Sequence, residues 1–140
     1  MSLYLDCNVV VALLTPDALS DRAVRIRRPD DDFIFVSDFA AAEFAAVISR
    51  RVRTRTCTRD EGRTALDKFD AWVAATARGV ELSPADIVTA GSYLRRLDLT
   101  LSAPDAIHIA TAQRLGASLL TFDRAMAAAA RVLGVTLVEV

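Results

Sequence analysis

Carboxylates that follow predicted strands are the residues of this sequence best placed to do chemistry. Asp6 ends a short apolar segment and Asp123 follows another, while Asp105 lies in the first turn of a predicted helix. Glu43 lies one turn into the helix after the second strand. Sites in open parallel sheets form beyond the carboxyl ends of the strands, where the strand order reverses. We therefore expect these four acids to converge at one edge of a sheet.

Four carboxylates in one place repel one another and raise each other's pKa values, unless a divalent cation neutralises them. Oxygen ligands without nitrogen or sulfur select Mg²⁺ or Mn²⁺ over Zn²⁺. Such a site generates hydroxide from bound water and stabilises the charge on a phosphodiester. The pattern thus favours metal-dependent phosphodiester hydrolysis.

Three of the acids also have a purely structural explanation. Asp123 can cap the helix that follows it, and Asp105 can belong to a Ser102-x-x-Asp105 capping box. Asp6 can be a turn residue at the end of its strand. These alternatives stay open on sequence grounds.

Glu43 is the hardest of the four to explain as a structural residue. It is the only charge between Asp38 and Arg50, so we expect its carboxylate to be largely desolvated. A buried carboxylate without partners is strongly destabilising. Glu43 therefore requires a cation, a charged partner or a raised pKa.

Composition excludes several other classes of protein. The chain has 140 residues, 53% of them hydrophobic, and a net charge of -1, so neither disorder nor a global charge imbalance is indicated. Two cysteines, Cys7 and Cys57, are too few for a disulfide framework or a zinc cage. His108 is the only histidine and is expected to be packed or hydrogen-bonded rather than titrating. No glycine-rich phosphate loop or nucleophile elbow is present.

The chain also lacks membrane signals. Its first residues carry no basic region, and no apolar run approaches the roughly 20 residues that span a bilayer. We expect a soluble, cytoplasmic protein without a membrane partner.

Alternation of short apolar and longer amphipathic segments predicts one α/β domain with a parallel sheet and helices on both faces. Strands are expected at 3–5, 33–36, 80–82, 118–121 and 135–138. Helices are expected at 9–14, 18–28, 38–52, 58–78, 83–96, 102–116 and 123–133. Gly79 and Gly116 are expected to end two of them.

The order and context of the four acids resemble those of PIN-domain ribonucleases, specifically the VapC-like toxins of bacterial type II toxin–antitoxin pairs. The resemblance covers essentially the whole chain. It is carried by 3–8, where the family has a strand ending in Asp-x-Asn or Asp-x-Ser, and by 36–43 with the acidic helix residue. Its most specific part is 101–112 together with 116–123. Each motif alone is weak, but all occur in order.

This resemblance implies a PIN-like three-layer sandwich with a central five-stranded parallel sheet, formed by a single PIN domain over 1–140. It implies a Mg²⁺-dependent endoribonuclease, with Mn²⁺ able to substitute. Asp6, Glu43, Asp105 and Asp123 would form the catalytic and metal-binding site, Asp6 and Asp105 foremost among the ligands. Asn8 and Thr121 match supporting polar positions. RNA as substrate, a cognate antitoxin and a homodimer are implied as partners.

A dense basic segment, Arg50–Arg59, supports a second hypothesis. Its arginines can grip RNA phosphates, pair with acidic residues of an antitoxin, or form a solvated helix end; they include Arg50, Arg51, Arg53 and Arg55. The chain would then be a non-catalytic PIN-fold module that binds RNA or protein, with the acids as caps. A phosphate-receiver domain is disfavoured, because it needs a strand-end lysine and Lys68 lies inside a predicted helix.

Overall fold

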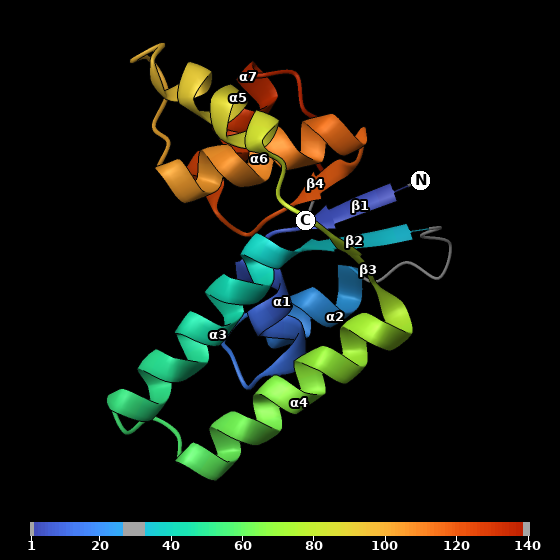
Figure 1. Ribbon diagram of the computed structural model, residues 1–140, viewed down its shortest axis with the longest axis vertical. Helices are drawn as coiled ribbons and strands as arrows, with labels where there is room; N and C mark the ends of the chain where they lie inside the picture. Colours follow the sequence, from blue (N-terminus) through green and yellow to red (C-terminus); the bar gives the residue numbers. More distant parts are fainter. Residues whose placement is uncertain (1, 27–32, 139–140) are drawn as a thin grey trace.

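A four-stranded parallel sheet with helices on both faces organises the molecule (Figure 1). The computed structural model describes residues 2–26 and 33–138. The strands are β1 (Ser2–Leu5), β2 (Phe33–Ser37), β3 (Arg78–Val80) and β4 (Ser118–Leu120), in the order β3-β2-β1-β4. The strand order thus reverses at β1, between β2 and β4, which is where a parallel sheet places a site.

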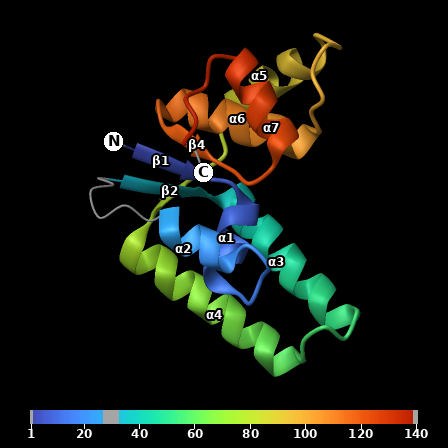
Figure 2. The same ribbon diagram turned by 180° about the vertical axis from the view of Figure 1, so that it is seen from behind.

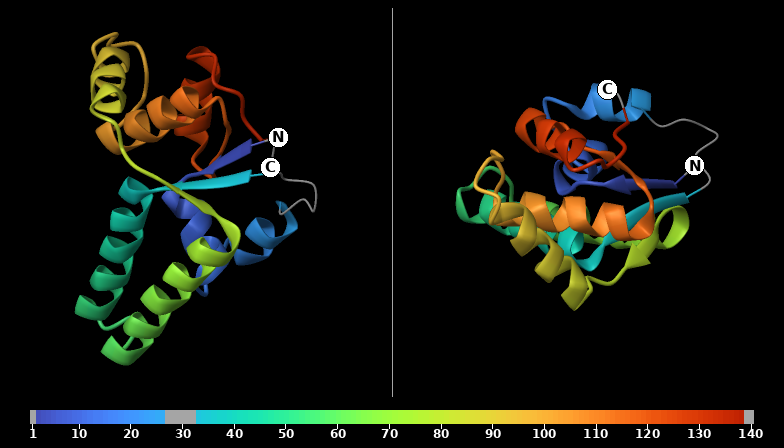
Figure 3. Two further views of the ribbon diagram at one scale, coloured as in Figure 1. Left: turned by 45° about the vertical axis from the view of Figure 1, so that its right-hand side comes forward. Right: turned by 90° about the horizontal axis from the view of Figure 1, so that it is seen from above.

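Helices from the two halves of the chain cover opposite faces of the sheet (Figure 1). One face carries α1 (Cys7–Leu14), α2 (Ser20–Ile26), α3 (Asp38–Arg53) and α4 (Arg59–Thr76). The other carries α5 (Pro84–Leu94), α6 (Ala103–Leu115) and α7 (Arg124–Val132). The helices α3 and α4 form a hairpin that extends away from the sheet (Figure 3). The expected three-layer α/β arrangement is therefore confirmed.

Two apolar cores lie on either side of the sheet. Because successive strand residues face opposite sides, Leu3 and Leu5 of β1 pack into the core under α1, α3 and α4, whereas Tyr4 packs into the core under α5, α6 and α7. In the first core Phe44 of α3 stacks on Phe69 of α4, with ring centres 4.7 Å apart. Packing of this kind fixes α3 against the sheet.

Side-chain caps fix where the helices begin. Ser37 accepts a hydrogen bond from the Ala40 amide at 3.0 Å and starts α3 directly at the end of β2. A reciprocal capping box between Thr58 and Glu61 starts α4. Gly116 ends α6 with a φ of 61°, in the left-handed region that favours glycine. These starts and this end agree with the sequence patterns.

Among residues 2–26 and 33–138, the sheet has four strands rather than the expected five. The segment 135–138 forms a single bridge, between Leu137 and Leu119. Only two hydrogen bonds join it to β4, from Leu119 N to Thr136 O at 2.8 Å and from Val138 N to Leu119 O at 3.0 Å. That contact is too short to form a ladder, so the expected fifth strand is wrong.

The long helix also ends earlier than expected. It stops at Thr76, and Ala77 is already extended, because the next residues pair with β2 through Phe35 and Arg78. Gly79 lies inside β3 instead of ending the helix. The expected helix at 18–28 is observed as α2, and its last two expected residues lie outside the described ones. Within 2–26 and 33–138, no helix is both long and apolar enough to cross a bilayer.

Candidate active site

Adjacent parallel strands bring the first and the last parts of the chain together at the candidate site. Leu5 of β1 pairs with Leu120 of β4, and the Asp6 amide donates to the Leu120 carbonyl at 3.0 Å. Asp6 precedes α1, but its carboxylate does not cap that helix. The Thr121 hydroxyl instead donates to Asp6 Oδ2 at 2.7 Å. The turn interpretation of Asp6 therefore does not account for its side chain.

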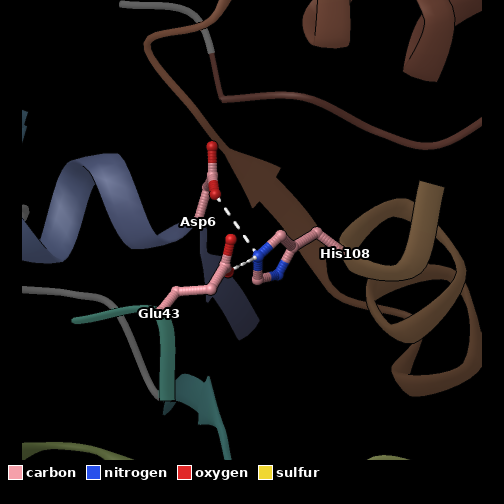
Figure 4. Close-up of side chains that lie close together, drawn as sticks. All are labelled: Asp6, Glu43 and His108. Carbon is pink, nitrogen blue, oxygen red and sulfur yellow. Dashed lines mark hydrogen bonds and ion pairs between the residues drawn. The ribbon is translucent and has the colours of Figure 1, made fainter. Parts of the chain in front are cut away.

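Glu43 from α3 and His108 from α6 meet Asp6 from two other elements (Figure 4). His108 Nε2 hydrogen-bonds to Glu43 Oε1 and lies 3.6 Å from Asp6 Oδ1. One possible ligand atom from each residue lies within 4.8 Å of the other two. This acidic triad, defined here as Asp6, Glu43 and His108, is the tightest group of potential metal ligands in the described part of the chain.

A buried hydrogen-bond chain holds His108 from its other side. Its Nδ1 lies 2.7 Å from the Tyr4 hydroxyl, which lies 2.8 Å from Ser37 Oγ. The His108 side chain is 1% exposed and packs against the rings of Tyr4 and Phe39. The expectation of a packed, hydrogen-bonded histidine is thus confirmed. Tyr4 links the ring to Ser37, the residue that caps α3.

Burial dominates the electrostatics of Asp6, which is 6% exposed. Desolvation raises the pKa of its carboxyl group, although His108 and the Thr121 hydroxyl act in the opposite direction and Glu43 adds to the rise. Burial also raises the pKa of the Tyr4 hydroxyl, and that of the Cys7 thiol to about 12. A nearby cation would stabilise the charged form of Asp6.

All four expected acids line one open hollow of about 640 Å³. Asp105 is half-buried; the Ser102 hydroxyl accepts from its amide at 3.3 Å, but its carboxylate does not complete the capping box. Asp123 is exposed and does cap α7, by accepting from Met126 N at 2.9 Å. The structural interpretation therefore holds for Asp123, which nevertheless faces the same hollow.

Glu43 is less buried than the sequence indicated. Its side chain is 30% exposed rather than largely desolvated, because it faces the hollow instead of the core. The partner that its carboxylate required is His108. Glu43 is thus held in place while remaining accessible to a ligand.

The two supporting residues, Asn8 and Thr121, hold the chain segment after β4. Asn8 Nδ2 donates to Thr121 Oγ1 at 3.3 Å, and Asn8 Oδ1 accepts from the Phe122 amide at 3.3 Å. The Asp123 amide donates to Thr121 Oγ1 at 3.1 Å. Thr121 therefore connects Asp6 with the segment that carries Asp123.

Three of the four expected arginines line the same hollow, namely Arg50, Arg51 and Arg53. Arg51 donates to Thr15 Oγ1 at 2.9 Å and lies 3.6 Å from Asp17. Arg55 is not part of this group, since it has a φ of 59° in the turn after α3 and lines a different hollow. The basic segment thus divides between two surfaces.

Sequence reasoning missed the link between Tyr4, His108 and the acids. A signal was available, because a buried tyrosine needs a partner for its hydroxyl and Tyr4 stands two residues before Asp6. The identity of that partner, 104 positions away, could not be read from local patterns.

A divalent cation fits this arrangement. A buried carboxylate with a raised pKa, a second carboxylate and an imidazole nitrogen each place one potential ligand atom within 4.8 Å of the other two. Two further carboxylates line the hollow. Hard cations such as Mg²⁺ and Mn²⁺ prefer the carboxylate oxygens that this site offers. With three arginines at its rim, the hollow suits a phosphate-bearing substrate.

Comparison with known proteins agrees with a site for a phosphate-bearing substrate. A family model described as PIN domain matches residues 3–132. Ribonuclease VapC3 of Pyrobaculum aerophilum is 28% identical over 127 residues, which cover 91% of this chain and 93% of that protein.

Two solved structures share the fold. VapC20 of Mycobacterium tuberculosis, described as a toxin that cleaves the sarcin–ricin loop, has a TM-score of 0.73 at 22% identity, covering 91% of this chain and 94% of that one. VapBC2 of Rickettsia felis, solved bound to a DNA fragment from its promoter, has a TM-score of 0.71 at 17% identity, covering 99% and 98%.

Proposed function

The chain belongs to the PIN domain family, and on that premise we propose that it is a Mg²⁺-dependent endoribonuclease that acts as the toxin of a type II toxin–antitoxin pair. The observation that carries this proposal is the acidic triad at the switch point of the sheet, in one hollow with Asp105, Asp123 and three arginines. The ribonuclease activity of the VapC3 relative supports the same reaction class.

The residues that would hold the ion are Asp6 and Glu43, with His108 Nε2 beside them and Asp105 and Asp123 within the hollow. Mg²⁺ or Mn²⁺, when bound, supplies an activated water and neutralises charge on the phosphodiester. The Thr121 hydroxyl orients the Asp6 carboxylate, and His108 orients that of Glu43. Arg50, Arg51 and Arg53 would bind the phosphates of the RNA.

An antitoxin is the proposed protein partner. The fold is shared with toxin–antitoxin complexes among solved structures. A carboxylate-lined hollow that must stay inactive in the cell suits occupation by a basic segment of such a partner. A homodimer belongs to the same proposal.

The non-catalytic alternative is not favoured. It requires the acids to serve as caps, and only Asp123 does so. The side chain of Asp6 bonds to Thr121 instead of capping α1, and that of Asp105 does not close its box.

Cleavage of total bacterial RNA by the metal-stripped protein tests the function. We expect discrete products with Mg²⁺ or Mn²⁺ and none with EDTA. Asp6→Asn should lower the rate at least about 100-fold, because even the partners that merely orient metal ligands contribute about 10–100-fold. Asp67→Asn is the matched control, since Asp67 is an exposed residue of α4 that does not line the hollow.

Either of two results would overturn the proposal. Cleavage by Asp6→Asn at the rate of the unaltered protein would remove the site assignment. A folded, antitoxin-free protein that cleaves no RNA with either metal would remove the activity itself.

A further inference from the structure

A second hollow lies next to the acidic one, on the other side of Asp123. Its volume is about 460 Å³, and α2, α7, the segment after β4 and the chain after α7 line it. Although α2 and α7 cover opposite faces of the sheet, both lie toward the viewer in Figure 2. Asp123 lines both hollows, and Thr121, which bonds to Asp6, lines this one. The second hollow therefore continues the candidate active site.

Most of the charged side chains around this second hollow are basic. Arg22, Arg124 and Arg131 line it, and Asp123 is the only acid among its described lining residues. Arg124 and Arg131 are exposed, and neither forms an ion pair within the described part of the chain. Two guanidinium groups thus remain available to an anion.

One face of α7 suits an extended anion. Arg124, Ala127 and Arg131 stand three and four residues apart and share a helix face, and the small Ala127 leaves space between the two guanidinium groups. Arg124 also occupies the first turn of α7, where the helix dipole disfavours a positive charge.

A stacking surface lies beside these charges. The Arg22 guanidinium carbon is 5.1 Å from the centre of the Phe122 ring, within the range of a cation–π contact. Both side chains line the second hollow. Unpaired RNA bases stack on flat guanidinium and aromatic surfaces of this kind.

We propose that the second hollow is a nucleotide subsite, in which Arg124 and Arg131 hold phosphates of the RNA strand and the Arg22–Phe122 pair receives an unpaired base. The proposal rests on the proposed ribonuclease function and adds the path of the substrate. Four carboxylates repel a polyanion, so binding energy must come from positive charges that flank them.

The two basic surfaces belong to hollows that meet at Asp123. The arginines of α3 line the acidic hollow, and those of α2 and α7 line the second one. A strand bound to both hollows passes Asp123, which lines each of them. The substrate is then a single-stranded or looped segment, because a paired base is not free to stack on the protein.

Binding of a short fluorescent RNA of random sequence, measured in EDTA so that no cleavage occurs, tests the subsite. The variant combines Arg124→Gln with Arg131→Gln. We expect its affinity to fall about tenfold and the slope of log K against log salt to decrease by about 1.4, since each single-strand phosphate contact contributes about 0.7. In cleavage assays with Mg²⁺ its KM should rise while kcat stays unchanged.

The matched control combines Lys68→Gln with Arg95→Gln, which removes the same charge from exposed positions that line neither hollow. Equal affinity and salt slope in the α7 variant and this control would overturn the subsite, while metal-dependent cleavage would leave the proposed function standing. If the α7 variant binds RNA as before but no longer binds the antitoxin, the subsite is likewise overturned, and the second hollow is a surface that binds a protein. An unaltered protein that neither binds nor cleaves RNA would overturn both proposals.

Discussion

Single residues of the candidate site are tied to the fold by buried hydrogen bonds, and Tyr4 is the clearest case. Its hydroxyl joins Ser37, the cap of α3, to His108, the partner of Glu43. The site is therefore positioned by a residue that does not line its hollow. Every buried side-chain polar atom in the described part of the chain has a hydrogen-bond partner. Removing the Tyr4 hydroxyl would therefore create a buried polar atom without a partner, which is rare in folded proteins.

Tyr4→Phe should lower the free energy of unfolding by about 1–3 kcal/mol, because it leaves the buried Nδ1 of His108 without a partner and removes one of the hydrogen bonds of Ser37. Urea unfolding measures the loss. Tyr93→Phe is the control, since its hydroxyl bonds to the exposed Gln113, which water can satisfy. Equal losses in the two variants would contradict the special role of Tyr4.

At this scale the sequence identified the acids but not the geometry that joins them. Asp6 and Glu43 could be found because each is a charge in an apolar segment. The half-exposed state of Glu43 could not, because it depends on the hollow that α3 shares with α1 and α6. Contacts between residues 65 to 115 positions apart leave no local pattern.

Between elements, the pair of α5 and α6 is joined by a partly buried ion pair outside the site. The Arg114 guanidinium donates to both carboxylate oxygens of Asp86, at 2.7 and 2.9 Å. Asp86 also completes the capping box of α5 by accepting from the Ser83 amide. Burial alone would raise the pKa of Asp86, but the hydrogen bonds from Arg114 and Ser83 outweigh it and lower the pKa below its usual value.

Asp86→Asn should destabilise the protein by about 1–3 kcal/mol at neutral pH, since charge-assisted hydrogen bonds are lost. A lowered pKa stabilises the fold above the unfolded value of about 4, and this contribution disappears as pH falls through the folded value. The difference between the variant and the unaltered protein should therefore shrink in acid. Urea unfolding across that pH range measures it.

The control for this prediction is Asp98→Asn. Asp98 pairs with Arg96 at 2.9 Å on the surface, where water screens the interaction, so its loss should leave stability nearly unchanged. A penalty for Asp86→Asn that stays constant with pH would show that the carboxylate charge is not what joins α5 and α6.

The boundaries of helices were predicted best where a capping side chain marks the end of the helix. The helices expected to begin at 38, 58 and 83 begin within one residue of those positions, where the side chains of Ser37, Thr58 and Ser83 cap them. Gly79 misled the prediction because pairing of 78–80 with β2 decides that boundary, and a glycine fits a strand there. The fifth strand failed for a similar reason, since its apolar residues make only one bridge. Long-range pairing, unlike capping, is not encoded locally.

For the molecule as a whole, metal binding should be measurable as an increase in the stability of the folded protein. A ligand that binds only the folded chain stabilises it by about 2.7 kcal/mol at 100 times its Kd. Mg²⁺ or Mn²⁺ should therefore raise the melting temperature of the metal-free protein by several degrees, and EDTA should reverse the rise. Calorimetry at constant ionic strength measures both.

Asp6→Asn should abolish this rise, while Asp67→Asn should retain it. An equal rise in both variants would show that the ion binds elsewhere on the chain. The measurement does not depend on cleavage, so it separates loss of the ion from loss of the reaction.

The pairing of β1 with β4 also sets the time at which the candidate site can assemble. β1 is synthesised before its neighbour β4, and Thr121, whose hydroxyl bonds to Asp6, follows Asp6 by 115 residues. Until then Asp6 lacks the contact that orients it, and Asp105 and Asp123 are absent or unplaced. A chain whose synthesis stops before β4 therefore carries no assembled site, and any activity of the site has to wait until that strand has been made.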